Sequence, residues 1–377
     1  MTNSQVMWGI QRLFIGHDLS SEYDDEVRFS ARKVRAMANR SMIVNSVFDL
    51  IGNTPMLRLC SKNQAWEYFL KLEKWNPGQS MKDRAVLSMI QSAEVQGRLK
   101  PGGTIVESSS GNTAIGLAIM AAVKGYKFLA VMDHHAPVEK VNMIRAYGGE
   151  IVFVDSPLGM EEGLALDKRE KLASELAHKT PNAIYIEQHH NPANTHAYPT
   201  TLAREIIGTI PDLDLFFAAI GTTGSICGTS KGFKAVGRNI RVIAVEPKGS
   251  IFFSDEGAPY FQSGTGNPMG AELPRILDRS LIDEGLQVTD TEAFACCRAL
   301  ARRFGLLLGG SAGGVMYRAL DYTSAKGGSG KAVILACDGG EKYLSTIYND
   351  DWMRENGLLA PELELEVETS LTHPSQV

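Results

Sequence analysis

The fold is decided by the stretch Thr104-Ile-Val-Glu-Ser-Ser-Ser-Gly-Asn-Thr113, in which a short apolar strand passes through a polar turn into a helix. Thr104–Val106 is short, apolar and β-branched, which favours a buried strand. The turn that follows is rich in hydroxyls, and Asn112 opens the helix. A strand that leads directly into a helix is half of a βαβ unit, so this stretch predicts a parallel sheet.

The same alternation recurs along the chain from Val44 onward. Further strands are predicted at Met56–Leu59, Tyr68–Leu72, Phe128–Met132, Ile151–Val154, Ile184–Ile186, Leu215–Ile220, Val242–Val245 and Ala332–Leu335. Amphipathic helices are predicted at Ser80–Gln96, Val138–Tyr147, Gly163–His178, Asn194–Ile207 and Glu292–Phe304. Apolar strands separated by helices are typical of parallel sheets covered on both faces. We therefore expect an α/β protein of two domains, each a mostly parallel twisted sheet flanked by helices.

The expected domains are not continuous in sequence. Residues 1–42 are mixed, charged and only weakly helical, so we expect them to form an N-terminal extension. An N-terminal α/β domain is predicted at 76–190, and a C-terminal α/β domain at 43–75 together with 191–358. Residues 359–377 carry alternating glutamates and are predicted to be a loosely held acidic tail.

The composition is that of an ordinary globular protein. The chain has 377 residues, of which 44% are hydrophobic and 21% charged. A formal net charge of −5 gives no reason to expect binding to nucleic acid or to an anionic membrane. The sequence contains no apolar run near the roughly 20 residues that a membrane-spanning helix needs. We expect neither nucleic acid nor a membrane as a partner.

The cysteines and histidines indicate neither disulfides nor a metal. The five cysteines are odd in number and lack CxxC spacing, which argues for a reducing compartment. The N-terminus shows no secretory signal, so the expected location is the cytoplasm. His134-His135 and the group His189, His190 and His196 lack carboxylate or cysteine ligands at metal-binding spacing, so no metal site is expected.

The first of four informative turns is Asn76-Pro-Gly-Gln-Ser-Met-Lys-Asp-Arg84. Ser80 and Asp83 have the spacing of a capping box, which places Lys82 in the first turn of a helix. The positive end of the helix dipole disfavours an ammonium there, and a lysine with a lowered pKa is a better amine nucleophile. The alternative is a surface lysine in a capped helix.

The other three turns also follow strands or open helices. The Glu107–Thr113 turn suits a carboxylate or phosphate, or is a plain helix cap. Gly221-Thr-Thr-Gly-Ser225 follows an apolar strand and suits a phosphate, but it lacks the ending of a Walker A loop and the spacing of a dinucleotide fingerprint. Gly309-Gly-Ser-Ala-Gly-Gly314 opens another helix, where glycine is also compatible with close packing. In open α/β sheets ligands bind beyond the carboxyl ends of strands, so the four turns predict one site.

In this order, the four turns resemble the cysteine synthase/cystathionine β-synthase family of fold-type II pyridoxal phosphate (PLP) enzymes. The resemblance runs from about Val44 to Trp352 and rests on Asn-Pro-x-x-Ser-x-Lys-Asp-Arg, Ser-Gly-Asn-Thr, Gly-Thr-x-Gly-Ser and Gly-Gly-Ser-Ala-Gly. It implies pyridoxal 5'-phosphate as cofactor, small amino-acid substrates and a homodimer.

The resemblance also implies a role for each site residue. Lys82 would hold the cofactor as a Schiff base and act as general base, Asn112 would bond its ring hydroxyl, and Ser311 would meet its pyridine nitrogen. The cofactor phosphate is expected on Gly221, Thr222, Thr223, Gly224 and Ser225. The substrate carboxylate is expected on Ser109, Ser110, Asn112, Thr113 and Gln188.

The residue opposite the pyridine nitrogen bears on the type of reaction. A hydroxyl does not stabilise a protonated ring, so prompt loss of a β-substituent is favoured over a long-lived carbanion. The implied activity is that of a transferase that replaces the β-substituent of an O-activated L-serine through an aminoacrylate.

Shorter features resemble the N-(2-amino-2-carboxyethyl)-L-glutamate synthases, which join O-phosphoserine to glutamate on the way to 2,3-diaminopropionate for siderophores and antibiotics. They are Met81, Thr222–Ile226, Pro247–Ile251 and Tyr348-x-Asp-x-Trp352. Arg169 matches an arginine near the substrate in that subfamily. It suits a donor phosphate or the carboxylate of the second substrate.

Two residues depart from that subfamily. His189 stands where it has tyrosine, and Gly221 where it has serine and cysteine synthases have glycine. Open alternatives are a cysteine synthase that uses O-acetylserine or O-phosphoserine with sulfide, a serine/threonine dehydratase-type lyase, and a catalytically silent protein.

Overall fold

A computed structural model describes residues 43–134, 136–154 and 162–374. The chain divides into two units, Met1–Asp49 and Leu50–Val377. The expected extension at 1–42 lies outside the described residues, and the first described element is the helical turn η1 (Val47–Leu50). Both sheets belong to the second unit.

The larger sheet has seven strands in the order β11-β1-β2-β10-β7-β8-β9. They are β1 (Met56–Ser61), β2 (Trp66–Leu72), β7 (Leu215–Ala219), β8 (Arg241–Pro247), β9 (Glu284–Val288), β10 (Gly330–Ala336) and β11 (Leu371–Thr372). The strands from β2 to β9 are parallel, and β1 and β11 form an antiparallel edge. Ile334 of β10 lies between Leu70 and Phe217 in register, and all three are fully buried at the centre of the core.

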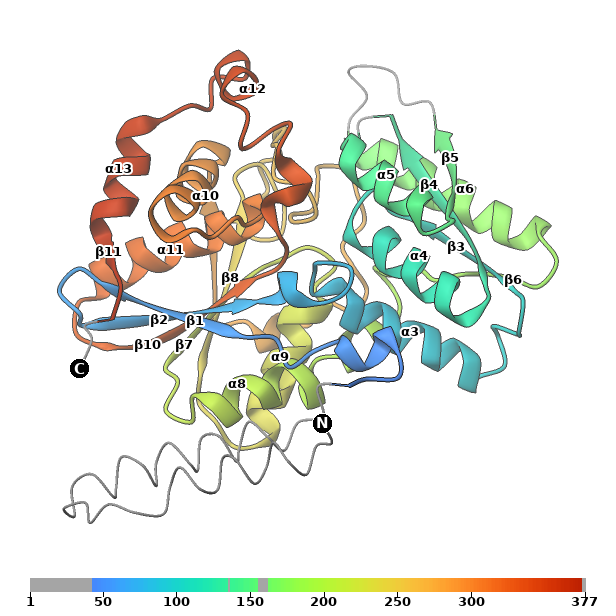
Figure 1. Cartoon of the computed structure of the whole chain (residues 1–377), viewed down its shortest axis with the longest axis horizontal. Helices are drawn as coiled ribbons and strands as arrows, with labels where there is room; N and C mark the ends of the chain where they lie inside the picture. The colour runs from blue at the N-terminus through green and yellow to red at the C-terminus, as the bar shows by residue number, and fades with distance from the viewer. Residues whose placement is uncertain (1–42, 135, 155–161, 375–377) are drawn as a thin grey trace, which may run out of the picture. The chain divides into compact units, whose positions relative to one another are not determined.

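Helices cover both faces of this sheet. Figure 1 shows α10 (Asp290–Phe304), α11 (Gly310–Lys326) and α13 (Pro361–Ser370) on one side, and α8 (Arg204–Thr209) and α9 (Gly224–Ala235) on the other. The shorter elements of this region are η2 (Glu73–Trp75), η4 (Arg279–Leu281), η5 (Gly340–Tyr343) and α12 (Asp350–Glu355).

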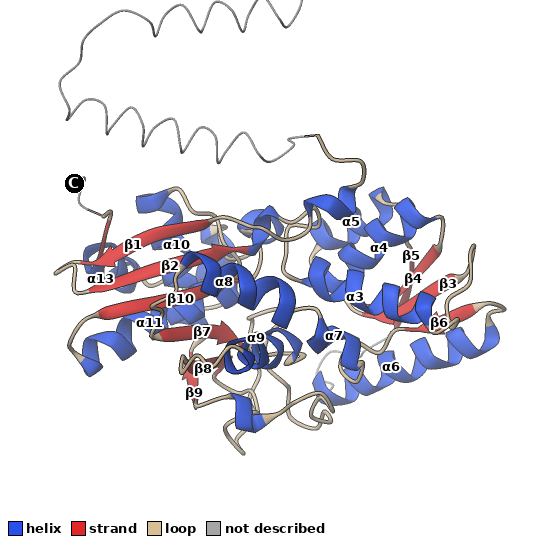
Figure 2. Cartoon of the chain, turned by 90° about the horizontal axis from the view of Figure 1, so that it is seen from below, coloured by secondary structure: helices blue, strands red, loops and turns tan. Residues whose placement is uncertain are grey.

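The smaller sheet is wholly parallel, with the strand order β5-β4-β3-β6. Its strands are β3 (Thr104–Ser108), β4 (Lys127–Asp133), β5 (Glu150–Val154) and β6 (Ala183–Tyr185). Figure 2 shows α4 (Asn112–Lys124) and α5 (Val138–Ala146) on one side and α6 (Glu162–Lys179) on the other. The helix α3 (Lys82–Val95) packs on α4.

The predicted fold class is confirmed: both sheets are parallel or mostly parallel and are flanked by helices. All four strands of the smaller sheet fall within 76–190, whereas the larger sheet takes its strands from 43–75, from 191–358 and from 371–372. The domain limits themselves remain a prediction.

Several elements differ from those predicted. The strands β9 and β11 were not expected, and the helix expected at Asn194–Ile207 is divided into α7 (Pro192–His196), a π-helical turn η3 (Pro199–Ala203) and α8. Pro199 explains the division because proline has no N–H to continue the helical hydrogen bonds.

The expectation of a loosely held tail after residue 358 is wrong. Residues Pro361–Ser370 form α13, and Glu364 is buried against α10, where it pairs with Arg298 (2.8 Å) and Arg302. After this helix, β11 adds to the edge of β1. A buried carboxylate with two guanidinium partners fixes the segment, although its acidic composition alone suggests solvent exposure.

Within the described residues, no helix combines the length and apolar character that a bilayer crossing requires.

Candidate active site

Lys82 is the first residue of α3, but the expected capping box is wrong. The Asp83 carboxylate accepts the N–H of Gly78 at 2.5 Å, while the Ser80 hydroxyl accepts the N–H of Lys82 at 3.2 Å. The chain before the helix folds back onto Asp83 so closely that a Cβ at Gly78 would lie 2.4 Å from its Oδ1. The Asp83 side chain therefore does not form a capping box. It binds instead a turn in which glycine allows the close approach at position 78.

The Lys82 loop is held against the end of β10. The N–H of Met81 donates to the carbonyl of Cys337 at 2.9 Å, and Ser80 forms a backbone bridge with Asp338. Burial lowers the pKa of Lys82, and electrostatic interactions with Cys337 and Asp338 offset part of this effect. The direction agrees with the sequence prediction, although burial rather than the helix dipole is the main cause.

Asn112 begins α4 and makes two hydrogen bonds across the cavity wall. Its Nδ2 donates to Asp338 Oδ2 at 2.8 Å, and its Oδ1 accepts from Lys342 Nζ at 2.7 Å. Asp338 and Lys342 were not among the residues predicted from the sequence. Asp338 had an available signal, because it follows the end of the apolar strand Ala332–Leu335, where ligands bind in parallel sheets.

The residues expected to grip a carboxylate lie next to one another at the end of β3. Thr113 donates to Gln188 Oε1 at 2.6 Å, and Gln188 Nε2 donates to Glu107 Oε1 at 3.2 Å. Burial raises the pKa of Glu107 well above its usual range, and the hydrogen bond from Gln188 offsets part of this rise. Ser109 and Ser110 line the same side of the cavity.

The loop expected to bind phosphate joins β7 to α9. Thr223 caps the helix with a positive φ of 66°, and its buried hydroxyl has no hydrogen-bond partner among the described atoms. A Cβ at Gly224 would lie 2.2 Å from the Asn194 side chain, so this position requires glycine. The first N–H groups of α9 have no acceptor within the helix, which leaves them available to an anion.

Ser311 lies in the first turn of α11 and is buried beside Cys337. Burial raises the pKa of Cys337 to about 12, and a hydrogen bond from Ser311 offsets part of this rise. The thiol is therefore neutral, and Ser311 is a neutral hydroxyl at the inner wall of the cavity.

One cavity of about 800 Å³ collects these residues. All residues predicted for the site line it, apart from Thr223 and Gly224: Lys82, Ser109, Ser110, Asn112, Thr113, Arg169, Gln188, Gly221, Thr222, Ser225 and Ser311. The two exceptions lie in the same loop as Gly221 and Ser225. The structure thus brings the four predicted turns together at one place.

Arg169 reaches the cavity from α6 and forms an ion pair with Asp133. Its Nε is buried without a hydrogen-bond partner among the described atoms, and burial lowers the pKa of Arg169. His189, one of the two departures from the resembled subfamily, pairs with Glu170 at 2.9 Å.

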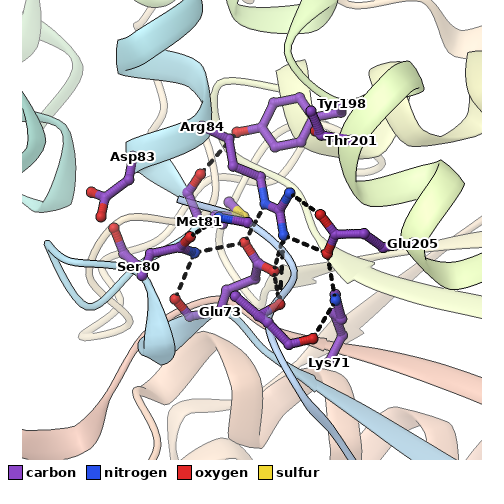
Figure 3. A network of polar contacts seen from close by, with 12 residues as sticks. Lys71, Glu73, Ser80, Met81, Asp83, Arg84, Tyr198, Thr201 and Glu205 are labelled. Atoms are coloured by element: carbon purple, nitrogen blue, oxygen red, sulfur yellow. Dashed lines mark hydrogen bonds and ion pairs between the residues drawn. The ribbon is translucent and has the colours of Figure 1, made fainter. Parts of the chain in front are cut away.

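A second group of polar residues lies behind the Lys82 loop. Figure 3 shows Arg84 between the carboxylates of Glu73 and Glu205. Arg84 Nε lies 2.7 Å from Glu73, and Arg84 Nη1 lies 2.7 Å from Glu205. Lys71 adds a bond of 2.6 Å to Glu205. We call Lys71, Glu73, Arg84 and Glu205 the closed network. It ties η2, α3 and α8 together directly beside Lys82.

The comparison with known families decides the identity. The family described as pyridoxal-phosphate dependent enzymes matches residues 47–338. This chain belongs to that family. The protein is a PLP-dependent enzyme of the cysteine synthase type, a β-replacement transferase, and pyridoxal 5'-phosphate is its cofactor.

Three relatives illustrate the range of this family. A putative cysteine synthase of Sinorhizobium fredii is 46% identical over 87% of this chain and 97% of its own. The crystal structure of an O-ureido-L-serine synthase is 35% identical, with a TM-score of 0.74 over 83% of this chain and 99% of that one. An O-acetylserine-dependent cystathionine β-synthase from Helicobacter pylori is 32% identical, with a TM-score of 0.75 over 82% of this chain and all of that one (100%).

The residues present fit this cofactor. PLP needs an amine, an anion site for its phosphate, and polar groups at its ring oxygen and nitrogen. In this enzyme Lys82 would supply the amine, and the unpartnered Thr223 hydroxyl with the first N–H groups of α9 would bind the phosphate. Asn112 would contact the ring oxygen, and Ser311 the ring nitrogen. The cofactor, when bound, supplies an electron-withdrawing ring that makes the α-proton of an amino acid acidic.

Proposed function

We propose that this enzyme joins an O-activated L-serine, with O-phosphoserine as the favoured donor, to the amine of an amino acid such as L-glutamate. The product would be a precursor of 2,3-diaminopropionate, a building block for siderophores and antibiotics. The proposal refines the established β-replacement activity by naming its two substrates.

The observation that carries the proposal is the cation in the cavity wall. Arg169 lines the cavity, and its ion pair with Asp133 still leaves one buried guanidinium N–H without an acceptor. A buried unsatisfied donor is costly, so a bound anion would stabilise the site. A phosphate or a second carboxylate satisfies this requirement, whereas hydrosulfide makes little use of a guanidinium fork.

The aromatic lining of the cavity supports an organic nucleophile. Phe261 and Trp352 both line the cavity and meet edge to face with their ring centroids 5.4 Å apart. Phe261 is half exposed, at 50%. Such a surface suits the methylene groups of an amino acid, while sulfide requires no apolar surface.

Each site residue has a proposed task. Lys82 would accept the proton from the substrate α-carbon, since burial favours its neutral form. Ser109, Ser110 and Thr113 would hold the substrate carboxylate, with Gln188 fixed by Glu107 behind them. The loop from Gly221 to Ser225 would hold the cofactor phosphate.

A cysteine synthase is the second candidate. The relative from Sinorhizobium fredii is named a putative cysteine synthase, and a relative from Bacillus subtilis, which is 38% identical, is named a probable cysteine synthase. Gly221 also agrees with cysteine synthases. In this case the nucleophile would be sulfide.

The test is a matrix of two donors, O-phosphoserine and O-acetylserine, against glutamate and sulfide, with products identified by mass spectrometry. We expect the highest kcat/KM for O-phosphoserine with glutamate. A strong preference for sulfide would contradict the proposal in favour of the cysteine synthase, and release of pyruvate without a second substrate would indicate a lyase.

Arg169→Ala separates the roles open to the arginine. If it contacts the donor phosphate, kcat/KM should fall about tenfold to a hundredfold with O-phosphoserine and much less with O-acetylserine. Equal losses with both donors would assign Arg169 to the second substrate. Asp133→Asn is the matched control, because it removes the negative charge of the partner and keeps the cation; it should not reduce the use of O-phosphoserine.

A further inference from the structure

The Asn112 amide is held by a hydrogen-bond donor on one side and by a hydrogen-bond acceptor on the other. Lys342 Nζ lies 2.7 Å from Oδ1, and Asp338 Oδ2 lies 2.8 Å from Nδ2. An ammonium can only donate and an ionised carboxylate can only accept. The two partners therefore fix which end of the amide is oxygen and which is nitrogen, and one N–H of Nδ2 remains uncommitted at the cavity.

Lys342 is a buried hub between the start of α4 and the loop that leads to Lys82. It is only 1% exposed, and its ammonium donates to the carbonyls of Gly78 at 2.9 Å and Gln79 at 3.1 Å as well as to Asn112. All three of its N–H donors are thus used. A surface lysine would have no need for such a complete set of acceptors.

Asp338 completes the arrangement from the end of β10. It is 1% exposed, and its Oδ2 accepts from both Asn112 and the Tyr343 hydroxyl, each at 2.8 Å. Its Oδ1 has no partner among the described atoms. A Cβ at Gly309 would lie 2.0 Å from that oxygen, so the carboxylate is confined sterically.

We propose that Lys342 and Asp338 are positioning residues that lock the Asn112 amide with an N–H, not its carbonyl, presented to the ring oxygen of PLP. Without the hydrogen bonds to Lys342 and Asp338, the Asn112 amide can rotate by half a turn. Its oxygen would then face the ring oxygen of PLP, and the two oxygens repel each other. This role of Lys342 and Asp338 depends on the PLP family and not on the identity of the two substrates. It can therefore be tested independently of the proposed function.

The experiment compares Lys342→Met with Lys140→Met. Lys140 is an equally buried lysine, 1% exposed, which contacts Ser263 at 3.0 Å and Tyr343 at 3.4 Å but not Asn112. Apo protein is titrated with PLP, and the absorption spectrum of the bound cofactor is recorded. Lys342→Met should weaken PLP binding about tenfold and reduce the form whose ring oxygen is ionised. Lys140→Met should change both by less than about twofold.

A double-mutant cycle identifies the route of the effect. If Lys342 acts through Asn112, then adding Lys342→Met to Asn112→Ala should cause almost no further change in the spectrum or in PLP affinity. Asp338→Asn tests the other partner, because its amide can donate to the wrong end of Asn112; it should shift the spectrum in the same direction. Additive effects, or equal spectra for Lys342→Met and Lys140→Met, would overturn the proposal.

Discussion

Two polar clusters adjoin the Lys82 loop, and they differ in how completely their hydrogen bonds are satisfied. In the closed network, Arg84 uses its donors on Glu73 and Glu205, and the structure assigns partners to all the buried polar atoms of its four members. In the cavity wall, by contrast, the buried atoms Ser108 Oγ, Arg169 Nε and Asp338 Oδ1 have no partner among the described residues.

This difference in hydrogen bonding indicates that the closed network supports the fold and that the cavity wall binds ligands. Buried polar groups are normally hydrogen-bonded, so atoms that lack a partner in the wall of a cavity are available to a ligand bound there. The closed network needs no ligand and positions α3, whereas the cavity wall is complete only with cofactor and substrate. Mutations in the first cluster should therefore lower stability, and mutations in the second should lower activity.

The largest expected effect is on activity. Lys82→Ala should reduce turnover by at least about a thousandfold, because the amine that holds the cofactor and accepts the α-proton is lost. Its free energy of unfolding without cofactor should change by less than about 1 kcal/mol. Steady-state rates and urea unfolding check both halves, and near-normal turnover would refute the assignment of Lys82.

The next largest effect is on stability. Arg84→Met leaves the buried Glu73 and the partly buried Glu205 without their main cation, so it should cost about 3–5 kcal/mol of unfolding free energy. Arg354→Met is the control, since that arginine is exposed and pairs with the exposed Asp351; it should cost less than about 0.5 kcal/mol. Similar midpoints for the two variants in urea unfolding would remove the distinction between the clusters.

A pH-dependent effect tests Lys140, which lies between the cavity-wall residues Ser263 and Tyr343. Burial lowers its pKa to about 8, with Glu139, Asp338 and Lys342 as its charged neighbours. Between pH 8 and the ordinary lysine value of 10.5, the unfolded chain binds a proton that the folded protein has released, so this lysine makes stability rise with pH. Lys140→Met should therefore stabilise the protein by roughly 1–3 kcal/mol below pH 8, and the gain should disappear toward pH 10.5. A constant difference across that range would show that Lys140 does not titrate as described.

The smallest expected effect is at the inner wall. Ser311→Asp should slow β-replacement about tenfold, because a carboxylate there favours the protonated pyridine ring, and the spectrum of the bound cofactor should change. Ser311→Ala, which brings no charge, is the matched control and should leave the ring unprotonated. If both variants behave like the wild type, Ser311 does not face the ring.

The sequence predicted the parts of the site that depend on local pattern. The strand-turn-helix stretches placed Lys82, Asn112 and Ser311 at helix starts, and the structure has α3, α4 and α11 beginning there or one residue before. Within one sheet, parallel strands end at the same edge and bring such turns together. The site combines turns from both sheets, because β3 belongs to the smaller sheet and β7 to the larger one. Which part of the cofactor or substrate each turn binds remains a prediction.

What the sequence missed depends on partners far away along the chain. Asp338 meets Asn112 across 226 positions, and nothing near Lys342 distinguishes it from a surface lysine. The tail was misjudged for the same reason, because Glu364 is buried by Arg298, 66 positions earlier. The capping box at Ser80 failed because a turn at Gly78 used the Asp83 carboxylate instead.

The central claim is that PLP is held by Lys82, at the boundary between the two clusters. The holoenzyme is reduced with borohydride to fix the cofactor on its lysine, digested, and analysed by peptide mass spectrometry. We expect the pyridoxyl label on Lys82 alone. Label on another buried lysine, such as Lys71, Lys140 or Lys342, or no label at all in a protein that binds PLP, would contradict it.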